Sequence, residues 1–191
     1  MNVLAVNGSP RPKGNTAILL RTVCEALEAE GIGTETFQLG GQAVRGCTGC
    51  YACLKNQDGR CVLPDDAVSE CLEKMKTADG ILLGSPTYFA DVTAEMKALV
   101  DRAGFVLRVN GDLLHRKVGA AVVAVRRAGA IHAFDTLNHF FLISGMIVPG
   151  SSYWNLGIGL KPGDVEGDDE GIQTMTALGE NMAWLLKRLE A

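Results

Sequence analysis

The chain has 191 residues, of which 47% are hydrophobic, and this is enough for a sizeable core in a single domain. Its formal net charge of −4 gives no basic field for a phosphate backbone or an anionic surface, so we expect neither nucleic acid nor a membrane as a partner. The first residues, MNVLAVNG, lack a basic start, and no long apolar run occurs anywhere. We therefore expect a cytoplasmic protein, in which clustered cysteines serve as ligands or redox groups more often than as structural disulfides.

Three apolar runs predict strands that are buried on both faces, at Val3–Val6, Ile81–Leu83 and Val118–Val125. A fourth strand is predicted at Thr34–Leu39, where polar and apolar residues alternate as they do at a sheet edge. A fifth is predicted at Met146–Val148.

Apolar residues recur at helix spacing between and after these strands, for example at Leu20, Val23, Cys24 and Leu27. Alternating strands and helices predict an α/β fold with a doubly wound, five-stranded parallel sheet of order 2-1-3-4-5 and helices on both faces. We expect residues 1–191 to form one domain, with residues 40–64 as a cysteine-rich insertion loop after the second strand.

The first strand leads into GSPRPKGNT, residues 8–16, directly before a predicted helix. In such sheets, ligands bind at the carboxyl ends of the strands, where the connections diverge. Backbone N–H groups and the helix N-terminus would converge there on a phosphate, with Ser9, Asn15 and Thr16 as donors and Arg11 as a charged contact. The loop matches neither the Walker pattern nor G-x-G-x-x-G, and the alternative is an ordinary helix cap after a turn.

The neighbouring strand ends in GSPTYF, residues 84–89. Pro86, Thr87, Tyr88 and Phe89 would place rigid backbone and two aromatic rings beside the phosphate site, which suits a flat, aromatic, phosphate-bearing ligand. The alternative is a tight turn whose aromatic side chains belong to the core.

A third strand end reads VRRAGA, residues 125–130. Arg126 and Arg127 would favour negative charge on the ligand ring, unless they belong to a solvated loop.

The insertion loop carries four cysteines in the pattern C-x2-C-x2-C-x7-C: Cys47, Cys50, Cys53 and Cys61. Structural zinc usually takes two separated C-x2-C pairs, whereas three closely spaced cysteines and a more distant fourth favour a [4Fe-4S] cluster. Zinc and free or redox-active thiols are the alternatives. Four thiolate bonds would order a loop that has no apolar periodicity. The remaining cysteines, Cys24 and Cys71, lie on apolar helix faces and are expected in the core.

The order of motifs along the chain resembles that of the iron-sulfur flavoproteins, a branch of the flavodoxin-like superfamily of NAD(P)H-dependent FMN reductases. The resemblance rests on GSPRPKGNT, the four cysteines, CVLPDD, ADGILLGSPTYF, AEMKALVDR and GMIVPGSSYWN, and it covers nearly the whole chain. The flavin loops are shared across the superfamily, whereas the cysteine spacing marks the iron-sulfur branch.

The resemblance implies a role for each motif. The residues that would hold the FMN phosphate are Ser9, Arg11, Asn15 and Thr16. Those that would border the isoalloxazine are Pro86, Thr87, Tyr88 and Phe89, with Arg126, Arg127 and Gly129 approaching from the fourth strand. The family implies homodimers that pair into homotetramers, with the cluster of one subunit near the flavin of another. Tyr153 and Trp154 are candidates for that interface, or for a loop folded on its own subunit.

The expected function is electron transfer between a [4Fe-4S] cluster and FMN, with flavin N5 as the reactive atom and no protein nucleophile. NAD(P)H, a ferredoxin-type protein or a small molecule would be the redox partner. One alternative is an NAD(P)H-dependent FMN or quinone reductase without a cluster. The other is a zinc-ordered, non-enzymatic binding module.

Overall fold

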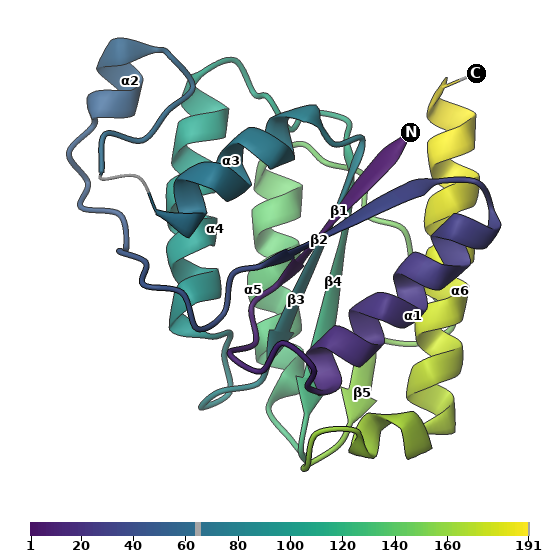
Figure 1. The fold of residues 1–191 in the computed structure, drawn as a ribbon. Coiled ribbons are helices and arrows are strands. Elements are labelled where there is room, and N and C mark those ends of the chain that lie inside the picture. The colour runs from purple at the N-terminus through teal and green to yellow at the C-terminus, as the bar shows by residue number, and fades with distance from the viewer. Residues whose placement is uncertain (64–65, 191) are drawn as a thin grey trace.

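The computed structural model describes residues 1–63 and 66–190. Its five strands form one parallel sheet in the order β2-β1-β3-β4-β5, which confirms the predicted topology (Figure 1). The strands are β1 (Asn2–Asn7), β2 (Gly33–Gln38), β3 (Gly80–Pro86), β4 (Val118–Val125) and β5 (Leu156–Ile158).

Helices cover both faces of the sheet, as expected for a doubly wound fold (Figure 1). The helices are α1 (Asn15–Ala29), α2 (Ala52–Asn56), α3 (Ala67–Thr77), α4 (Ala94–Val109), α5 (Ala130–Ile143), the short 3-10 helix η1 (Asp164–Gly167) and α6 (Asp169–Glu190). Helices α1 and α6 lie on one face, and α3, α4 and α5 lie on the other. Within residues 1–63 and 66–190, no helix is both long enough and apolar enough to cross a bilayer.

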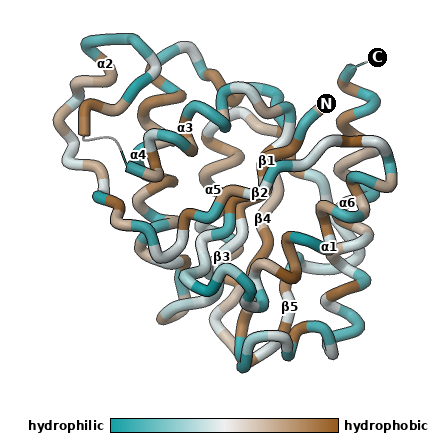
Figure 2. The backbone as a smooth tube through the Cα atoms, viewed as in Figure 1, coloured by the Kyte–Doolittle hydropathy of each residue, from teal (hydrophilic) through white to brown (hydrophobic). Residues whose placement is uncertain are grey.

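Successive side chains of each strand point to opposite faces of the sheet, so the core consists of two layers, one on each face. Val3 and Ala5 of β1 pack against α1 and α6, while Leu4 and Val6 of the same strand pack against the other layer. Every residue of β4 is buried, because helices cover it on both sides. Figure 2 shows these apolar strands running through the middle of the molecule, with hydrophilic residues in the connecting loops.

The prediction of the fifth strand was wrong. In the predicted segment Met146–Val148, only Ile147 forms an isolated parallel bridge, with Val118. The ladder stops there, since Pro149 has no N–H to donate. The chain then leaves β4 and pairs with it again only at Leu156–Ile158, beside the last residues of β4.

The cysteine-rich insertion contains one helix that the sequence pattern does not indicate, α2 (Ala52–Asn56). Left-handed residues, Tyr51 and Gln57, flank it at both ends. The predicted end of the insertion, Pro64, falls outside the described residues. Figure 1 shows α2 at the upper left of the molecule, outside α4 and away from the sheet, whereas the carboxyl ends of the strands lie at the bottom.

Candidate active site and cysteine centre

The loops that follow β1 and β3 lie side by side at the carboxyl end of the sheet. The backbone N–H of Gly8 donates to the carbonyl oxygen of Gly84 at 2.8 Å, and the Thr93 hydroxyl donates to the carbonyl oxygen of Gly8 at 2.8 Å. The backbones approach so closely that a Cβ on Gly8 would stand 2.9 Å from the Gly84 oxygen. The sequence predicts both loops at this edge of the sheet, and in the structure hydrogen bonds connect them directly.

A cavity of about 120 Å³ opens between these loops and the end of β4. Eight residues predicted as cofactor contacts line it: Ser9, Arg11, Asn15, Thr16, Pro86, Thr87, Tyr88 and Arg126. Three others, Phe89, Arg127 and Gly129, do not. Ala124 and Val125 supply the floor from β4, and Gly159 and Leu160 form a wall that the sequence did not reveal.

The N-terminus of α1 faces this cavity without a side-chain cap. Its N-cap residue is Gly14, and no side chain accepts a hydrogen bond from the first turn. The alternative that Ser9, Asn15 or Thr16 merely caps the helix therefore fails. Uncapped N–H groups at the positive end of a fifteen-residue helix favour an anion.

Two buried hydroxyls in the cavity wall have no hydrogen-bond partner, Thr16 Oγ1 and Thr87 Oγ1. A buried hydroxyl without a partner costs about 1 to 3 kcal/mol, so native proteins rarely leave one unless a ligand or an ordered water supplies the partner. One belongs to the helix start and the other to the β3 loop, and both residues line the same cavity. The donor set fits the phosphate and polar ring edge of FMN.

A side-chain clamp fixes the path of the first loop. Gln38, at the end of β2, donates to the carbonyl oxygens of Ser9 and Gly40, both at 2.7 Å. Its amide oxygen accepts a hydrogen bond from Asn7, whose own oxygen accepts from the backbone N–H of Ser9 at 3.1 Å. The loop after β1 is thus held by a network of side-chain hydrogen bonds from Gln38 and Asn7.

The amide of Asn15 has a divided role. Its oxygen accepts a hydrogen bond from the backbone N–H of Gly163 at 2.9 Å, which anchors the segment after β5 against the helix start. Only the NH₂ group remains available to a ligand, consistent with its expected part as a donor. The same segment approaches so closely that a Cβ on Gly159 would stand 2.7 Å from the Asn15 nitrogen.

Beyond Tyr88 the chain makes a tight turn in which Phe89 and Ala90 both adopt positive φ values, 47° and 63°. Tyr88 and Asp91 exchange backbone hydrogen bonds of 2.8 and 3.0 Å around it. These angles belong to a type I′ turn, which normally takes glycine or asparagine. The turn explains why Phe89 lies outside the cavity: it holds the ring fully in solvent. Gly129 packs against the turn, where a Cβ would stand 3.2 Å from Ala90.

The four cysteines of the insertion line one small cavity, together with Tyr51 of the same loop and Arg102 and Phe105 of α4. Within residues 1–63 and 66–190, no three His, Cys, Asp or Glu side chains are arranged to hold a single metal ion. A tetrahedral zinc site needs every sulfur about 2.3 Å from one point. A [4Fe-4S] cube instead binds each thiolate through a different iron, so its ligands stand further apart.

Four thiols on one cavity are the donor set that a [4Fe-4S] cluster requires. The cavity holds about 20 Å³, and two of its four cysteines, Cys47 and Cys50, lie on the exposed part of the loop. Hydrogen bonds from the Ala52 backbone and the Thr48 hydroxyl hold the pKa of the Cys50 thiol below its ordinary value. Burial raises the pKa of Cys53. Cys24 and Cys71 are buried in the core, as predicted.

Comparison with known proteins identifies the family. Residues 1–161 match the family model described as NADPH-dependent FMN reductase. Over an alignment of 197 positions, which spans all of both chains, the protein is 42% identical to an iron-sulfur flavoprotein of Methanocaldococcus jannaschii. The chain belongs to the iron-sulfur flavoprotein family. A second iron-sulfur flavoprotein, from Methanosarcina thermophila, is 33% identical over 100% of this chain and 97% of that protein.

Membership in this family makes the protein an FMN-dependent oxidoreductase. Solved structures support the flavodoxin-like fold. RosB, solved with 8-demethyl-8-formylriboflavin-5'-phosphate, superposes with a TM-score of 0.80 at 20% identity and covers 100% of this chain and 80% of its own. A WrbA-like flavodoxin from Agrobacterium tumefaciens gives 0.68 at 13% identity, with 98% of both chains covered.

Proposed function

We propose that this iron-sulfur flavoprotein binds FMN in the cavity at the carboxyl ends of β1, β3 and β4, and carries a [4Fe-4S] cluster on the cysteines of its insertion loop. The observation that supports the flavin site best is the pair of unpartnered hydroxyls, Thr16 and Thr87, beside an uncapped helix N-terminus. The cluster is supported by four thiols on one cavity and by the names of the relatives from two archaea.

In this assignment the phosphate lies at the start of α1. Thr16 and the NH₂ group of Asn15 donate to its oxygens, together with the N–H groups of the first helical turn. Arg11 is exposed at the cavity rim and adds a charged contact. Ser9 donates its hydroxyl proton to the phosphate as well, and the same oxygen accepts the backbone N–H of Arg11, which shapes the loop.

The isoalloxazine then lies along the β3 and β4 loops. Pro86 and Tyr88 border it on one side, and Thr87 donates to a polar atom at its edge. Arg126, at the end of β4, faces the same cavity and would favour negative charge on the ring.

When both groups are bound, FMN exchanges a hydride or single electrons and the cluster exchanges single electrons, so together they join two-electron and one-electron chemistry. The chain's part is to bind, orient and shield both groups. NAD(P)H, a ferredoxin-type protein or a small molecule would supply or remove the electrons.

Transfer between subunits of a homodimer or homotetramer is the arrangement we favour. In one chain, the cysteine loop lies against the outer side of α4, whereas the flavin cavity lies at the carboxyl end of the sheet (Figure 1). A second copy would bring its cysteine loop to the cavity of the first. Tyr153 and Trp154 are exposed, with ring centroids 4.8 Å apart and ring planes tilted by 53°. They give an aromatic surface of the kind found where subunits meet.

Iron, acid-labile sulfide and flavin, assayed after anaerobic purification, test the proposal. We expect one FMN and about four iron and four sulfide per chain. In Cys61→Ala the iron and sulfide should disappear while FMN stays, and Cys24→Ala, a change in the core, should keep all three. Stoichiometric flavin without sulfide in the wild type would leave the cluster-free reductase as the function. Zinc in place of iron, without flavin, would leave a binding module.

A further inference from the structure

Arg102 is a buried charge that the flavin site does not use. It lies in the middle of α4, its side chain has no exposed surface, and it is among the largest fully buried side chains of the described residues. Arginine is rarely buried in this way unless another group pairs with its charge. It lines the same small cavity as Cys47, Cys50, Cys53 and Cys61.

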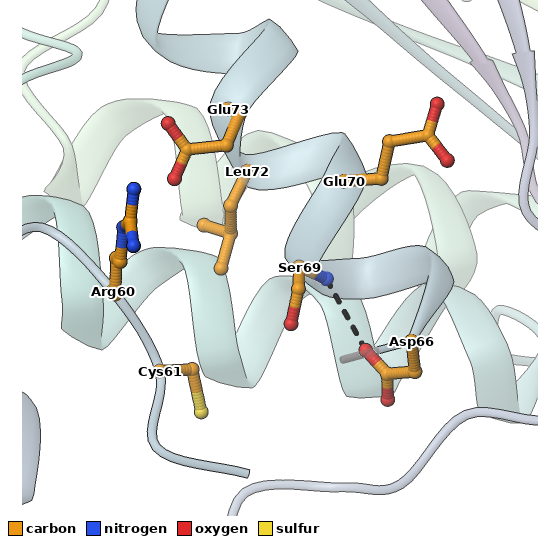
Figure 3. Close-up of a pocket in the computed structure, with 7 residues that line it drawn as sticks. All are labelled: Arg60, Cys61, Asp66, Ser69, Glu70, Leu72 and Glu73. Carbon is orange, nitrogen blue, oxygen red and sulfur yellow. Dashed lines mark hydrogen bonds between the residues drawn. The ribbon is translucent and has the colours of Figure 1, made fainter. Parts of the chain in front are cut away.

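One side of the guanidinium is fixed by oxygen atoms. Nη1 donates to Asp66 Oδ2 at 2.5 Å and to the carbonyl oxygen of Arg45 at 3.1 Å, and Nη2 donates to Ser69 Oγ at 3.3 Å. Asp66 is itself held at the start of α3, where its other oxygen accepts from the backbone N–H groups of Val68 and Ser69. Figure 3 shows Asp66 and Ser69 at this helix start, with the Cys61 thiol on the adjacent loop. The guanidinium therefore cannot rotate without losing its bond to Asp66, a residue that is itself fixed at the start of α3.

The remaining donor, Nε–H, is buried and has no hydrogen-bond partner. The thiol of Cys61 lies close to the guanidinium. Burial alone would lower the pKa of the Arg102 guanidinium, but its contacts with Asp66 and Cys61 raise it. A fixed cation with one unused donor thus stands at the wall of the thiol cavity. An isolated Arg–Asp pair that served only to join α3 to α4 would leave no reason for a buried donor without a partner on a residue that lines the thiol cavity.

We propose that Arg102 is a positioning residue for the cysteine centre: its Nε–H donates to a sulfur of the bound cluster or of Cys61, and its charge favours the reduced state. The inference rests on the proposed [4Fe-4S] cluster. A cluster with four thiolates is negative and gains one further negative charge on reduction, so a nearby cation and a hydrogen bond to sulfur both raise its reduction potential. Asp66 partly offsets that effect, since its carboxylate faces the same guanidinium.

Replacing Arg102 and Asp66 one at a time should shift the reduction potential of the cluster in opposite directions. A purely structural role of the pair would not give shifts of opposite sign. Arg102→Gln leaves the carboxylate of Asp66 without its cation, so the cluster should become harder to reduce. Asp66→Ser removes the counter-charge but keeps an oxygen that can cap α3, so the cluster should become easier to reduce. Arg102→Lys restores the charge without Nε–H and should fall between the wild type and Arg102→Gln.

The measurement is a reductive titration of the anaerobically purified holoprotein, with the reduced cluster followed by its EPR signal. Arg102→Gln should shift the oxidised-to-reduced equilibrium at least tenfold toward the oxidised form, which is about 59 mV for a one-electron couple. Asp66→Ser should shift it in the opposite direction. Iron, sulfide and FMN are counted in every sample, so that only loaded and folded protein is compared.

Three outcomes would overturn the inference. Equal potentials in wild type and Arg102→Gln would show that the guanidinium does not act on the cluster. Shifts of the same sign in Arg102→Gln and Asp66→Ser would reduce the pair to a structural link. A wild type that holds FMN but neither iron nor sulfide would remove the proposed cluster as well, and the assay separates that failure from the first two.

Discussion

The backbone N–H of Gly8 lies 2.8 Å from the carbonyl oxygen of Gly84, and this hydrogen bond joins the ends of β1 and β3 at the point where their loops part. Thr93 Oγ1, which donates to the Gly8 carbonyl oxygen, adds a second link from the start of α4. The two loops therefore act as one wall, so a disturbance at this junction reaches the whole cavity.

Gly8→Ala tests this junction. The new methyl group would stand 2.8 Å from Met96 Cε and 2.9 Å from the Gly84 oxygen, so the loops must separate. We expect the free energy of unfolding to fall by about 1 to 3 kcal/mol and FMN to bind at least about tenfold more weakly. Urea unfolding and fluorescence titration of the apoprotein with FMN measure both. Gly150→Ala, where a methyl group meets nothing within 4 Å, is the matched control and should change neither quantity.

Gln38→Glu tests the clamp beneath the phosphate loop. The substitution keeps the shape and the oxygen that accepts from Asn7, but it replaces the NH₂ donor to Ser9 and Gly40 with an acceptor. We expect a loss of about 1 to 3 kcal/mol in stability from two carbonyl groups left unpaired, and weaker FMN binding from the added negative charge. Thermal unfolding and FMN titration would show this. Unchanged FMN affinity would mean that the clamp does not shape the site.

The central fold and the place of the site were predictable from the sequence because they depend on local signals. Short apolar runs rich in valine, such as Val118–Val125, indicate buried strands, and glycine, serine and proline follow β1 and β3 directly. The topological rule for ligand sites then puts the loops together.

The features that the sequence did not reveal depend on long-range contacts. Leu156–Ile158 is short and contains a glycine, so Met146–Val148 is the better strand candidate by composition, until Pro149 ends its ladder. The wall at Gly159 and Leu160 exists only because the Gly159 N–H bonds to Val125 and Gly163 reaches Asn15.

Arg102 was hidden for a different reason. Its sequence neighbours suggest a surface charge on an amphipathic helix, but the folded insertion and the start of α3 together cover it. A cation that is buried by a distant loop leaves no local pattern.

Acidification should weaken the Asp66–Arg102 pair. Burial alone would raise the pKa of Asp66, but the hydrogen bonds from Arg102 and from the Ser69 backbone lower it below the ordinary value of 3.8. A carboxylate whose pKa is lower in the folded state stabilises that state above its unfolded pKa, and this stabilisation is lost as the pH falls through the folded value. Asp66→Ser should cost about 3 kcal/mol at pH 7, and progressively less below about pH 4.

Urea unfolding of the apoprotein from about pH 7 to about pH 2 measures this difference. Asp135→Ser, which removes an exposed carboxylate on α5, is the control and should leave stability nearly unchanged at neutral pH. A constant gap between wild type and Asp66→Ser at every pH would contradict the ionic role of Asp66.

The claim that the loop before α1 holds the phosphate of FMN is tested most directly by titrating the apoprotein with FMN and with riboflavin, which lacks the phosphate. We expect FMN to bind at least about a hundredfold more tightly, about 2.7 kcal/mol. Thr16→Val should shrink that ratio about tenfold and leave riboflavin binding unchanged, while Thr22→Val, whose hydroxyl bonds only to Ile18 one turn along α1, should have no effect. Equal affinities for FMN and riboflavin, or an equal loss of both in Thr16→Val, would contradict the account.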